Sequence, residues 1–429
     1  PLLVGFLMTL SLGAFPFIFV QGSQALTIRE GYVVIIISWF LSFLLGMIPY
    51  VIWGGPFNVV NAWFESVSGY TTTGSTILSD IEQLPRSLLL WRSSTHFIGG
   101  LGVVVFLLMV IPPSSPLRMK LSNLELSSLS RDTFNTRMSD TLRIIITVYI
   151  GLFVVMTALL VIAGMPVFDA VNHAFSTVAT GGCSIKNESV GFYGSGFINI
   201  IFGVFMILAS CHFALIYYSV ANRSLKPLRT PVLRYFICCI VVLTVFSTLS
   251  LHFQTAGGKS WTSSLSESLF EVVSYITTCG FAVTDNSAWP PVACAALLMA
   301  SFQCGCAGST SGGLKADRML IAFKALRLQI GKQVNPNAVR QVRIGGRIIS
   351  NGLVRSVMAF TILYILITVV STILLLFVNV PVDEAITGSL ASISNVGPGL
   401  GRIGCAGNYS HCIPVAKVIY SLEMIFGRP

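Results

Sequence analysis

The 429-residue chain has few charged residues. Only 10% of its residues are Asp, Glu, Lys or Arg, whereas 54% are hydrophobic and the mean hydropathy is +0.81. Soluble domains carry about 25% charged residues, and disordered or nucleic-acid-binding chains carry more. This scarcity excludes those classes. We therefore predict an all-α integral membrane protein that contacts lipid and binds no nucleic acid.

The sequence also lacks the motifs of common catalytic and metal sites. Its five histidines have no His-Glu-x-x-His spacing, its ten cysteines include no Cys-x-x-Cys pair, and no nucleophile elbow follows a strand pattern. We therefore expect no enzyme, no resident metal and no organic cofactor. Cys405 and Cys412 fall in one predicted outside loop, and a disulfide between them is left open because spacing does not establish geometry.

The Lys and Arg residues are concentrated in three segments, which lie within 118–143, 223–234 and 315–355. Because cytoplasmic loops carry the Lys/Arg excess, we assign these segments to the inner face and the remaining loops to the outer face. The segment 315–355 carries nine cations, which indicates contact with an acidic partner or anionic lipid. Positive-inside bias alone is the competing explanation.

A repeated unit organises the chain. A membrane helix needs about 20 apolar residues, and such stretches lie at 1–20, 33–53, 86–111, 141–164, 194–221, 232–253, 288–326 and 349–379, with a shorter one at 413–429. Four times, a short polar stretch follows an outward helix end, at 56–78, 166–185, 261–283 and 381–400. We predict four units of helix, re-entrant pore helix, glycine turn and helix. All four run in the same direction, so they can surround one axis as a pseudo-fourfold pore.

These units give the predicted domain boundaries. They are an extra N-terminal membrane helix at 1–30, then pore repeats at 31–117, 118–222, 223–347 and 348–429. The sequence begins at Pro1 rather than Met, so we expect the N-terminal helix to be truncated.

Each short stretch ends in a turn that contains glycine. Aligned on that glycine, the four turns read Thr72-Thr73-Gly74, Ala179-Thr180-Gly181, Thr278-Cys279-Gly280 and Asn395-Val396-Gly397. Irregular backbone at membrane depth persists where it lines a cavity, and glycine allows positive φ. Four such turns would form rings of carbonyl oxygens that replace the hydration shell of a monovalent cation. The competing interpretation is that each glycine merely ends a helix, which recurrence in four units makes the weaker one.

Three runs resemble a known family. FESVSGYTTTGST (64–76), QCGCAGSTSGG (303–313) and NVGPGLG (395–401) look like the potassium-uptake transporters of the Trk/Ktr/HKT superfamily, most closely the bacterial TrkH/TrkG type. The resemblance covers essentially the whole chain. It implies four units around a K+ filter, K+ as the transported ion, a homodimer in the bacterial inner membrane, and a cytosolic ring of nucleotide-binding TrkA-type subunits that controls opening.

The resemblance also implies a gate. Glycines interrupt the second crossing helix of the third repeat, and in the family such an intramembrane loop, here 304–313, closes the pore. An arginine after a Phe-Gly pair, here Arg428, lies near the axis. The candidate gating residues are Gly305, Gly308, Ser309, Gly312, Gly313 and Arg428. Close helix packing and a solvent-exposed chain end are the competing explanations. Family members continue the last helix, so we expect the fourth repeat to be truncated.

Four acidic residues lie on the predicted pore helices, namely Glu65, Asp169, Glu267 and Glu271. They could attract cations to the outer mouth or brace the turns from behind, since buried acids are usually paired. The function predicted is channel-like K+ uptake. A K+ symporter coupled to Na+ or H+ is the first alternative, and a membrane-embedded enzyme or scaffold that uses the glycine-rich loop or the cysteines is the second.

Overall fold

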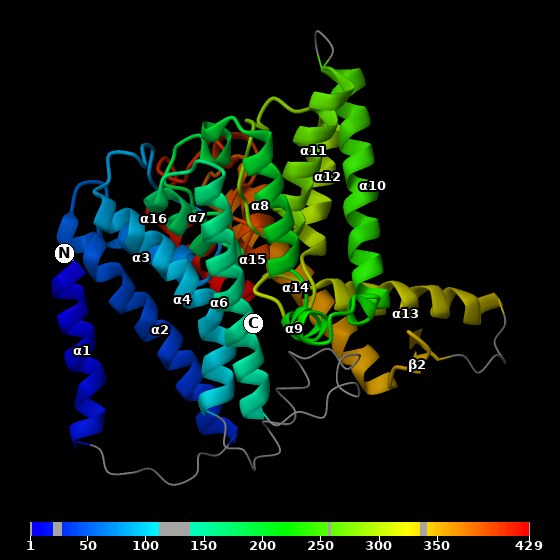
Figure 1. Ribbon diagram of the computed structural model, residues 1–429, viewed down its shortest axis with the longest axis horizontal. Helices are drawn as coiled ribbons and strands as arrows, with labels where there is room; N and C mark the ends of the chain where they lie inside the picture. Colours follow the sequence, from blue (N-terminus) through cyan, green and yellow to red (C-terminus); the bar gives the residue numbers. More distant parts are fainter. Residues whose placement is uncertain (1, 20–27, 111–137, 256–258, 335–340, 429) are drawn as a thin grey trace.

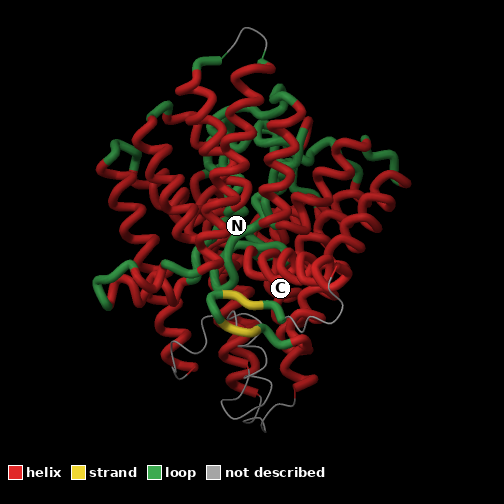
Figure 2. The backbone as a smooth tube through the Cα atoms, turned by 90° about the vertical axis from the view of Figure 1, so that its right-hand side faces the viewer, coloured by secondary structure: helices red, strands yellow, loops and turns green. Residues whose placement is uncertain are grey.

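The computed structural model describes residues 2–19, 28–110, 138–255, 259–334 and 341–428. These residues form helices almost throughout (Figures 1 and 2). The longer helices are α1 (Leu2–Phe19), α2 (Ile28–Trp53), α4 (Arg86–Val110), α6 (Met138–Ile162), α10 (Pro231–Gln254), α13 (Ala316–Val334) and α14 (Asn351–Phe377). The all-α fold class agrees with the sequence prediction. The predicted boundary at 117–118 lies outside the described residues.

Four shorter helices occupy the positions predicted for pore helices. They are α3 (Val59–Tyr70), α7 (Val167–Val178), α11 (Trp261–Ile276) and α15 (Val382–Ser394). Each packs between two neighbours in the same order along the chain: α3 between α2 and α4, α7 between α6 and α8 (Gly196–Ala209), α11 between α10 and α12 (Pro291–Gln303), and α15 between α14 and α16 (Pro414–Gly427). At 1.5 Å per residue, 12 to 16 residues span roughly 18–24 Å, which is less than the hydrocarbon core.

The starts of these short helices are specified locally. The side chain of Asn58 accepts a hydrogen bond from the backbone N–H of Asn61 at 2.8 Å, and Ser260 caps α11 in the same way through Ser263. Pro166 and Pro381 precede α7 and α15, where the missing N–H costs nothing because the first helical N–H groups have no partner within the helix.

Four helices are long and apolar enough to cross a membrane, within the described part of the chain. They contain the spans Val33–Trp53, Leu142–Ile162, Pro231–Gln254 and Asn351–Phe377. A fifth span is counted if α8 and α9 (Phe213–Ala221), which meet at 105°, form one broken crossing. Large apolar side chains such as Phe40, Phe253 and Phe377 are exposed on the outside of the bundle, as expected for a surface that faces lipid.

The prediction of one continuous helix over 194–221 is wrong. The chain breaks at Ser210–His212, although no glycine or proline marks the break. The backbone carbonyl of Ser210 instead accepts the N–H of Cys306 at 2.9 Å, and the Nδ1 atom of His212 caps α9 by accepting the N–H of Ala214 at 3.2 Å. The break expected in 288–326 is present, because α12 ends at Gln303 and α13 begins at Ala316.

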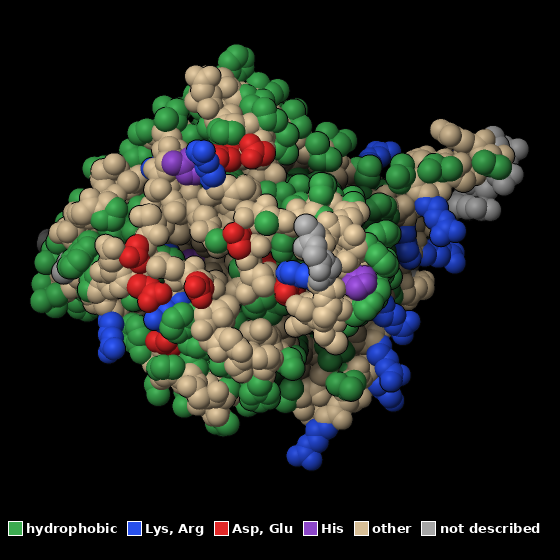
Figure 3. Space-filling view, turned by 90° about the horizontal axis from the view of Figure 1, so that it is seen from above, with side chains coloured by type: hydrophobic (Ala, Val, Ile, Leu, Met, Phe, Trp, Pro, Cys, Tyr) green, Lys and Arg blue, Asp and Glu red, His purple; other side chains and the backbone are tan. Residues whose placement is uncertain are grey.

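A small hairpin lies at the end of the molecule that carries the basic loops. Strand β1 (Arg343–Ile344) pairs antiparallel with β2 (Arg347–Ile348) across Gly345 and Gly346, whose φ angles of 58° and 83° suit a tight hairpin turn. The sequence analysis predicted no strand here. In Figure 1, α13 projects from the bundle above this hairpin. Asp and Glu side chains lie around the middle of the opposite face, seen from above in Figure 3.

Candidate functional site

The four pore helices end in the same backbone motif. The residue that ends each helix has a positive φ angle, 55° at Thr72, 54° at Thr180, 59° at Thr278 and 54° at Asn395. In each case its N–H bonds to the carbonyl three residues earlier, and the next N–H bonds to the carbonyl five residues earlier. This is the Schellman ending of a helix, in which glycine is the usual residue. Threonine in this conformation is strained, a feature typical of functional sites.

A glycine with positive φ follows two residues later in every turn. The φ angles are 85° at Gly74, 67° at Gly182, 76° at Gly280 and 96° at Gly397. The alignment of the second turn on Gly181 is therefore wrong by one residue: Thr180 corresponds to Thr72, and Gly182 corresponds to Gly74. Two adjacent glycines made the alignment ambiguous. Because threonine or asparagine ends each helix, the interpretation that these glycines merely end helices is also wrong.

The four turns, named turn one (72–75), turn two (180–183), turn three (278–281) and turn four (395–398), contact one another in a closed cycle. A Cβ atom on each glycine would collide with a backbone oxygen of the next turn. The distances are 2.1 Å from Gly74 to the oxygen of Gly181, 1.6 Å from Gly182 to that of Cys279, 2.1 Å from Gly280 to that of Val396 and 2.4 Å from Gly397 to that of Thr73. The carbonyl at the same position of each turn thus contacts the glycine of the preceding turn. The four turns surround one centre.

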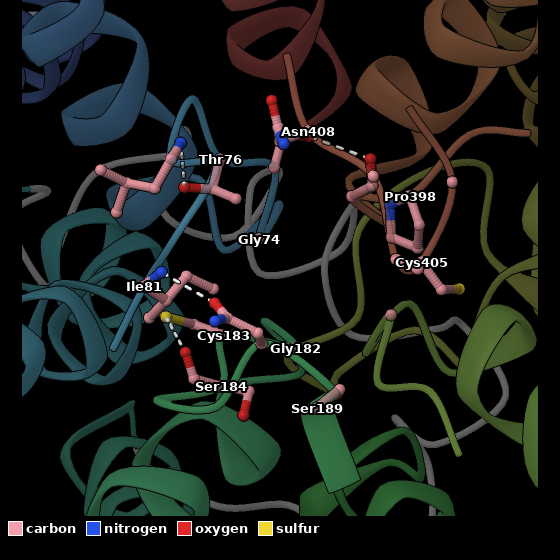
Figure 4. Close-up of a pocket in the computed structure, with 18 of the residues that line it drawn as sticks. Gly74, Thr76, Ile81, Gly182, Cys183, Ser184, Ser189, Pro398, Cys405 and Asn408 are labelled. Carbon is pink, nitrogen blue, oxygen red and sulfur yellow. Dashed lines mark hydrogen bonds between the residues drawn. The ribbon is translucent and has the colours of Figure 1, made fainter. Parts of the chain in front are cut away.

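A cavity of about 90 Å³ opens above this centre. All four glycines line it, and Figure 4 shows Gly74, Gly182 and Pro398 on different segments, with Cys405 and Asn408 on the segment that follows turn four. Much of the rest of its wall is polar, with Ser75, Thr76 and Ser184 among its residues. Backbone carbonyls and hydroxyl groups therefore lie close together where the four turns meet.

Two buried glutamates bind the backbone segments that follow turns one and three. Glu65 accepts the backbone N–H of Ile77 at 3.2 Å, and Glu271 accepts the N–H of Val283 at 2.9 Å. Each glutamate lies seven residues before the residue that ends its helix. Both are almost completely buried. Of the two roles considered from the sequence, the geometry favours bracing over attraction of ions at the mouth.

Arg92 of α4 completes the support of turn one, and the sequence analysis missed it. Its Nε atom lies 2.7 Å from the Glu65 carboxylate, and both side chains are 4% exposed. Its guanidinium also donates to the backbone oxygen of Ser184, beyond turn two, at 3.5 Å. The available signal was an arginine six residues inside the apolar stretch 86–111, because buried charges require partners.

The other two turns are supported differently. At the position of Glu65, the second pore helix has His173, whose Nε2 atom lies 3.0 Å from the Ser184 hydroxyl. The fourth has Gly388, where a Cβ would lie 2.7 Å from Ile403 and 2.8 Å from the Tyr420 hydroxyl. No acid can therefore brace turn four from its own pore helix at this position.

Turn four is held instead by its own asparagine side chain and by hydroxyl groups from the first and fourth repeats. The Asn395 amide donates to the Thr73 hydroxyl and to the backbone oxygen of Met424, both at 2.9 Å. The backbone oxygen of Gly397 accepts hydrogen bonds from the Ser75 hydroxyl at 3.0 Å and the Tyr409 hydroxyl at 3.2 Å. Turn four therefore depends on turn one and on the loop between α15 and α16.

The connecting loop 304–315 lies directly against the inner side of these turns. The Thr310 hydroxyl donates to the backbone oxygen of Val178 at 3.0 Å, and the Gly312 N–H donates to the Thr278 hydroxyl at 3.2 Å. A Cβ on Gly312 would lie 2.7 Å from Asn395. The loop thus contacts the ends of three pore helices. Thr310 was not among the predicted gating residues, although its hydroxyl contacts the end of the second pore helix.

The other predicted gating residues are packed within or against this loop. A Cβ on Gly305 would lie 2.8 Å from Ser311, one on Gly308 2.6 Å from His212, and one on Gly313 2.3 Å from the Cys304 sulfur. The Ser309 hydroxyl donates to the backbone oxygen of Cys306 at 2.7 Å. Glycine is required at positions 305, 308 and 313, because a side chain there would collide with these neighbours.

Arg428 reaches the loop from the end of α16. Its guanidinium donates to the backbone oxygen of Thr310 at 2.6 Å, and the side chain is buried. The carbonyl of Gly427 accepts the Gly313 N–H at 3.3 Å. Arg428 therefore does not occupy the frayed, water-exposed position that was the competing explanation.

The remaining candidates lie away from the glycine cycle. Glu267 pairs with Lys259 at 2.6 Å, and Asp169 accepts a hydrogen bond from Tyr193 at 2.8 Å. The disulfide left open between Cys405 and Cys412 is not formed, since both thiols are free. Cys405 lies against Tyr275 and Asn286, whereas Cys412 lies beside His411, so the two sulfurs have separate surroundings.

Polar contacts join the outer loops of the first two repeats. Asn187 donates to Asp80 at 2.8 Å, and Lys186 pairs with Glu82 at 3.0 Å. The hydrogen bond from Asn187 contributes most to holding the pKa of the Asp80 carboxyl below its usual value, because it favours the charged form. These contacts fix the rim of the outer cavity near turns one and two.

The fold and this arrangement define a multi-pass membrane protein with four glycine turns around one centre and no catalytic constellation among the described residues. The family described as TrkH, cation transport protein, matches residues 3–429. The chain is 35% identical to the Trk system potassium uptake protein TrkH of Salmonella typhimurium over 403 residues, 93% of this chain and 83% of that protein. It is 34% identical to TrkG of Escherichia coli over 404 residues, 93% of this chain and 82% of that protein.

A solved structure agrees over the whole chain. The crystal structure of the potassium transporter TrkH from Vibrio parahaemolyticus superimposes with a TM-score of 0.88 at 30% identity, covering 100% of this chain and 89% of that chain. The chain therefore belongs to the TrkH family of cation transport proteins, which confirms the resemblance found in the sequence. It is a transporter rather than an enzyme, located as a multi-pass protein in the bacterial inner membrane.

Proposed function

We propose that this chain takes up K+ through one central pore whose selectivity filter is formed by the four glycine turns. The observation that carries the proposal is the closed cycle in which Gly74, Gly182, Gly280 and Gly397 each meet a carbonyl of the next turn. Only glycine fits at these positions, so the four backbones can approach closely enough to share one ion. The potassium specificity named for the relatives is consistent with such a site.

In this proposal the ion exchanges its water for backbone oxygens of the turns. The filter residues are the pairs Thr72-Thr73, Ala179-Thr180, Thr278-Cys279 and Asn395-Val396 with the glycines Gly74, Gly181, Gly182, Gly280 and Gly397. The C-terminal ends of four pore helices point toward the turns and add negative partial charge, which favours a cation. Because the four turns carry different side chains, the four sides of the filter are not equivalent.

The connecting loop 304–315 serves as the inner gate in this proposal. It lies across the ends of three pore helices and is tied to α16 by Arg428. Its glycines permit close packing in the present arrangement and a different backbone path when the loop moves. Thr310 is the residue whose contacts must break for the loop to leave.

The gate has its own test, which is the rate of 86Rb+ uptake by a Thr310→Val variant. This change removes the hydroxyl that bonds to Val178 while keeping the side-chain volume, so we expect uptake to rise several-fold. Ser309→Ala is the matched control, since its hydroxyl bonds within the loop to Cys306. Equal uptake by the two variants and the parent would exclude the proposed role of this contact.

Regulation by a cytosolic nucleotide-binding TrkA-type ring, and pairing into a homodimer, belong to the same proposal. The projecting helix α13 and the hairpin enclose a groove of about 690 Å³ lined by Lys324, Arg327 and Arg343. Such a basic groove suits an acidic partner. The homodimer rests on family resemblance alone.

The experiment that tests the pore is 86Rb+ uptake into proteoliposomes with competing K+ or Na+. We expect K+ to block uptake much more strongly than Na+, and a Gly74→Ser variant to lose this difference because its Cβ collides with Gly181. Gly54→Ser is the control, because Gly54 has φ +76° but nothing within 4 Å of its Cβ position. If Gly74→Ser retains the ion preference of the parent, the filter assignment fails.

A further inference from the structure

Three side chains with metal-binding atoms meet near the outer end of α15. Glu384 lies in the first turn of that helix, while His411 and Cys412 lie in the loop that leads into α16. Their ligand atoms all lie within 4.8 Å of one another. The Nε2 atom of His411 is 2.9 Å from the Glu384 carboxylate and 3.8 Å from the Cys412 sulfur. Within the described parts of the chain, this is the one such group of three.

The distances are close to those of a zinc centre. With Zn–N and Zn–O bonds of about 2.0 Å and a Zn–S bond of about 2.3 Å, tetrahedral ligand atoms lie roughly 3.3 Å apart for N and O and roughly 3.6 Å apart for S and N. The two separations from the His411 nitrogen, 2.9 Å and 3.8 Å, lie within about 0.4 Å of these values. Three protein ligands would leave the fourth position for water.

The surroundings favour entry from outside and retention once bound. Glu384 and Cys412 are buried, at 2% and 7% exposure, whereas His411 is exposed. The nearest cation, Lys417, is held by the Asn61 side chain at 2.9 Å and the Ser410 carbonyl at 3.1 Å, so it does not occupy the ligand atoms. A zinc ion can therefore first bind the exposed His411 side chain and then be held by the buried Glu384 and Cys412 side chains.

We propose that Glu384, His411 and Cys412 form a site for one Zn²⁺ ion on the outer face of the protein. The thiol would release its proton to solvent on binding, as metal-bound cysteines do. None of these residues belongs to the filter or the gate. The site would instead fasten the loop between α15 and α16 to the start of the fourth pore helix.

Hydrogen bonds connect the site to turn four. The importance of this connection rests on the proposed function, in which turn four is part of the filter. The Cys412 N–H donates to the carbonyl of Tyr409 at 3.2 Å, and the Tyr409 hydroxyl donates to the carbonyl of Gly397 at 3.2 Å. The Tyr409 N–H also donates to the carbonyl of Thr76 at 2.8 Å. Zinc at Cys412 would therefore restrain Tyr409 against a filter carbonyl.

The test is zinc binding by the whole purified protein, measured in detergent by competition with a chromophoric chelator. We expect one tightly bound Zn²⁺ per chain in the parent, and binding weakened at least about tenfold by His411→Gln and by Cys412→Ser, since even outer-shell changes weaken metal sites 10–100-fold. Cys405→Ser is the matched control, because it removes another thiol of the same loop. His411 is exposed, and glutamine retains an N–H donor for Glu384, so we expect this substitution to preserve the fold.

X-ray absorption of the zinc-loaded protein provides a second measurement. We expect one sulfur ligand at about 2.3 Å in the parent and in Cys405→Ser, and none in Cys412→Ser. Absence of tight binding in the parent, equal binding in all variants, or a zinc shell without sulfur would each overturn the site. These measurements involve no ion flux, so failure of the zinc site is distinguishable from failure of the pore assignment.

Discussion

Turns one and three are held by side chains of their own pore helices, whereas turn four is held by side chains from outside its pore helix. Glu65 and Glu271 bind the backbone of the segments that leave their own turns. Turn four has Gly388 at that position and depends on Ser75 and Tyr409. The backbone angles of the four turns are nonetheless nearly the same. Different sets of side chains can thus maintain one repeated main-chain geometry.

This difference has a consequence for ion selection. Selectivity of a carbonyl ring depends on how its oxygens are positioned and how stiffly they are held. Turn one is fixed by the Glu65 carboxylate, which is paired with Arg92, while turn four is fixed by neutral hydrogen bonds, which are about half as strong as charge-assisted ones. We therefore expect turn four to relax more easily than turn one.

The largest effect is expected for Arg92→Met. This change leaves the Glu65 carboxylate buried without its cation, and breaking a buried pair costs about 3–5 kcal/mol. We expect a strong fall in the thermal unfolding temperature in detergent and loss of uptake. Arg86→Met, an exposed arginine of the same helix, is the control. Unchanged stability of Arg92→Met would remove the evidence that turn one is held by charge.

Glu271→Gln should have the next largest effect. It replaces one of the two carboxyl oxygens behind turn three with an NH2 group while keeping the side-chain volume, and weakening a buried hydrogen bond costs about 1–3 kcal/mol. We expect reduced preference for K+ over Na+ in 86Rb+ uptake. Glu267→Gln alters the partly exposed acid on the same helix and should change the preference little. Equal effects of the two variants would contradict the bracing role of Glu271.

Asn395→Thr gives turn four the residue present in the other three turns. We expect it to be harmful, at about 1–2 kcal/mol, because two amide hydrogen bonds are lost and threonine is strained at positive φ. Asn379→Thr measures the backbone cost alone, since Asn379 is exposed with φ 60°. If Asn395→Thr destabilises the protein no more than Asn379→Thr does, turn four does not depend on the asparagine amide.

The smallest effect is expected for Tyr409→Phe. It removes one hydrogen bond to the Gly397 oxygen, worth about 1 kcal/mol. We expect unchanged folding and a modest fall in K+ preference. Tyr193→Phe, which removes a hydroxyl bonded to Asp169 instead, should leave the preference unaltered. A preference equally insensitive to both changes would mean that Tyr409 does not restrain turn four.

The sequence was sufficient to predict the helical fold, the four short helices and the glycine in three of the turns. These features depend on hydropathy and on local backbone chemistry, which are visible in one repeat at a time. The glycine of turn two was misassigned because Gly181 and Gly182 are adjacent, and only the folded backbone distinguishes them, through the positive φ of Gly182 and its contact with Cys279.

The remaining features arise from contacts distant in sequence. The break between α8 and α9 is stabilised by Cys306 and Gly308, about 100 residues away along the chain. The pairing of Arg92 with Glu65 and the support of turn four by Tyr409 likewise require the tertiary fold. Local sequence patterns cannot reveal such contacts, because the residues around each partner do not indicate which distant residue it contacts.

The central claim is that four equivalent glycines close one selective ring, and 86Rb+ uptake by the four single variants Gly74→Ala, Gly182→Ala, Gly280→Ala and Gly397→Ala tests it most directly. Gly164→Ala is the control, since Gly164 has φ +95° but an open Cβ position. The account predicts that all four variants lose uptake or lose preference for K+ over Na+, while Gly164→Ala retains both. A Gly182→Ala variant that transports and selects like the parent would contradict it.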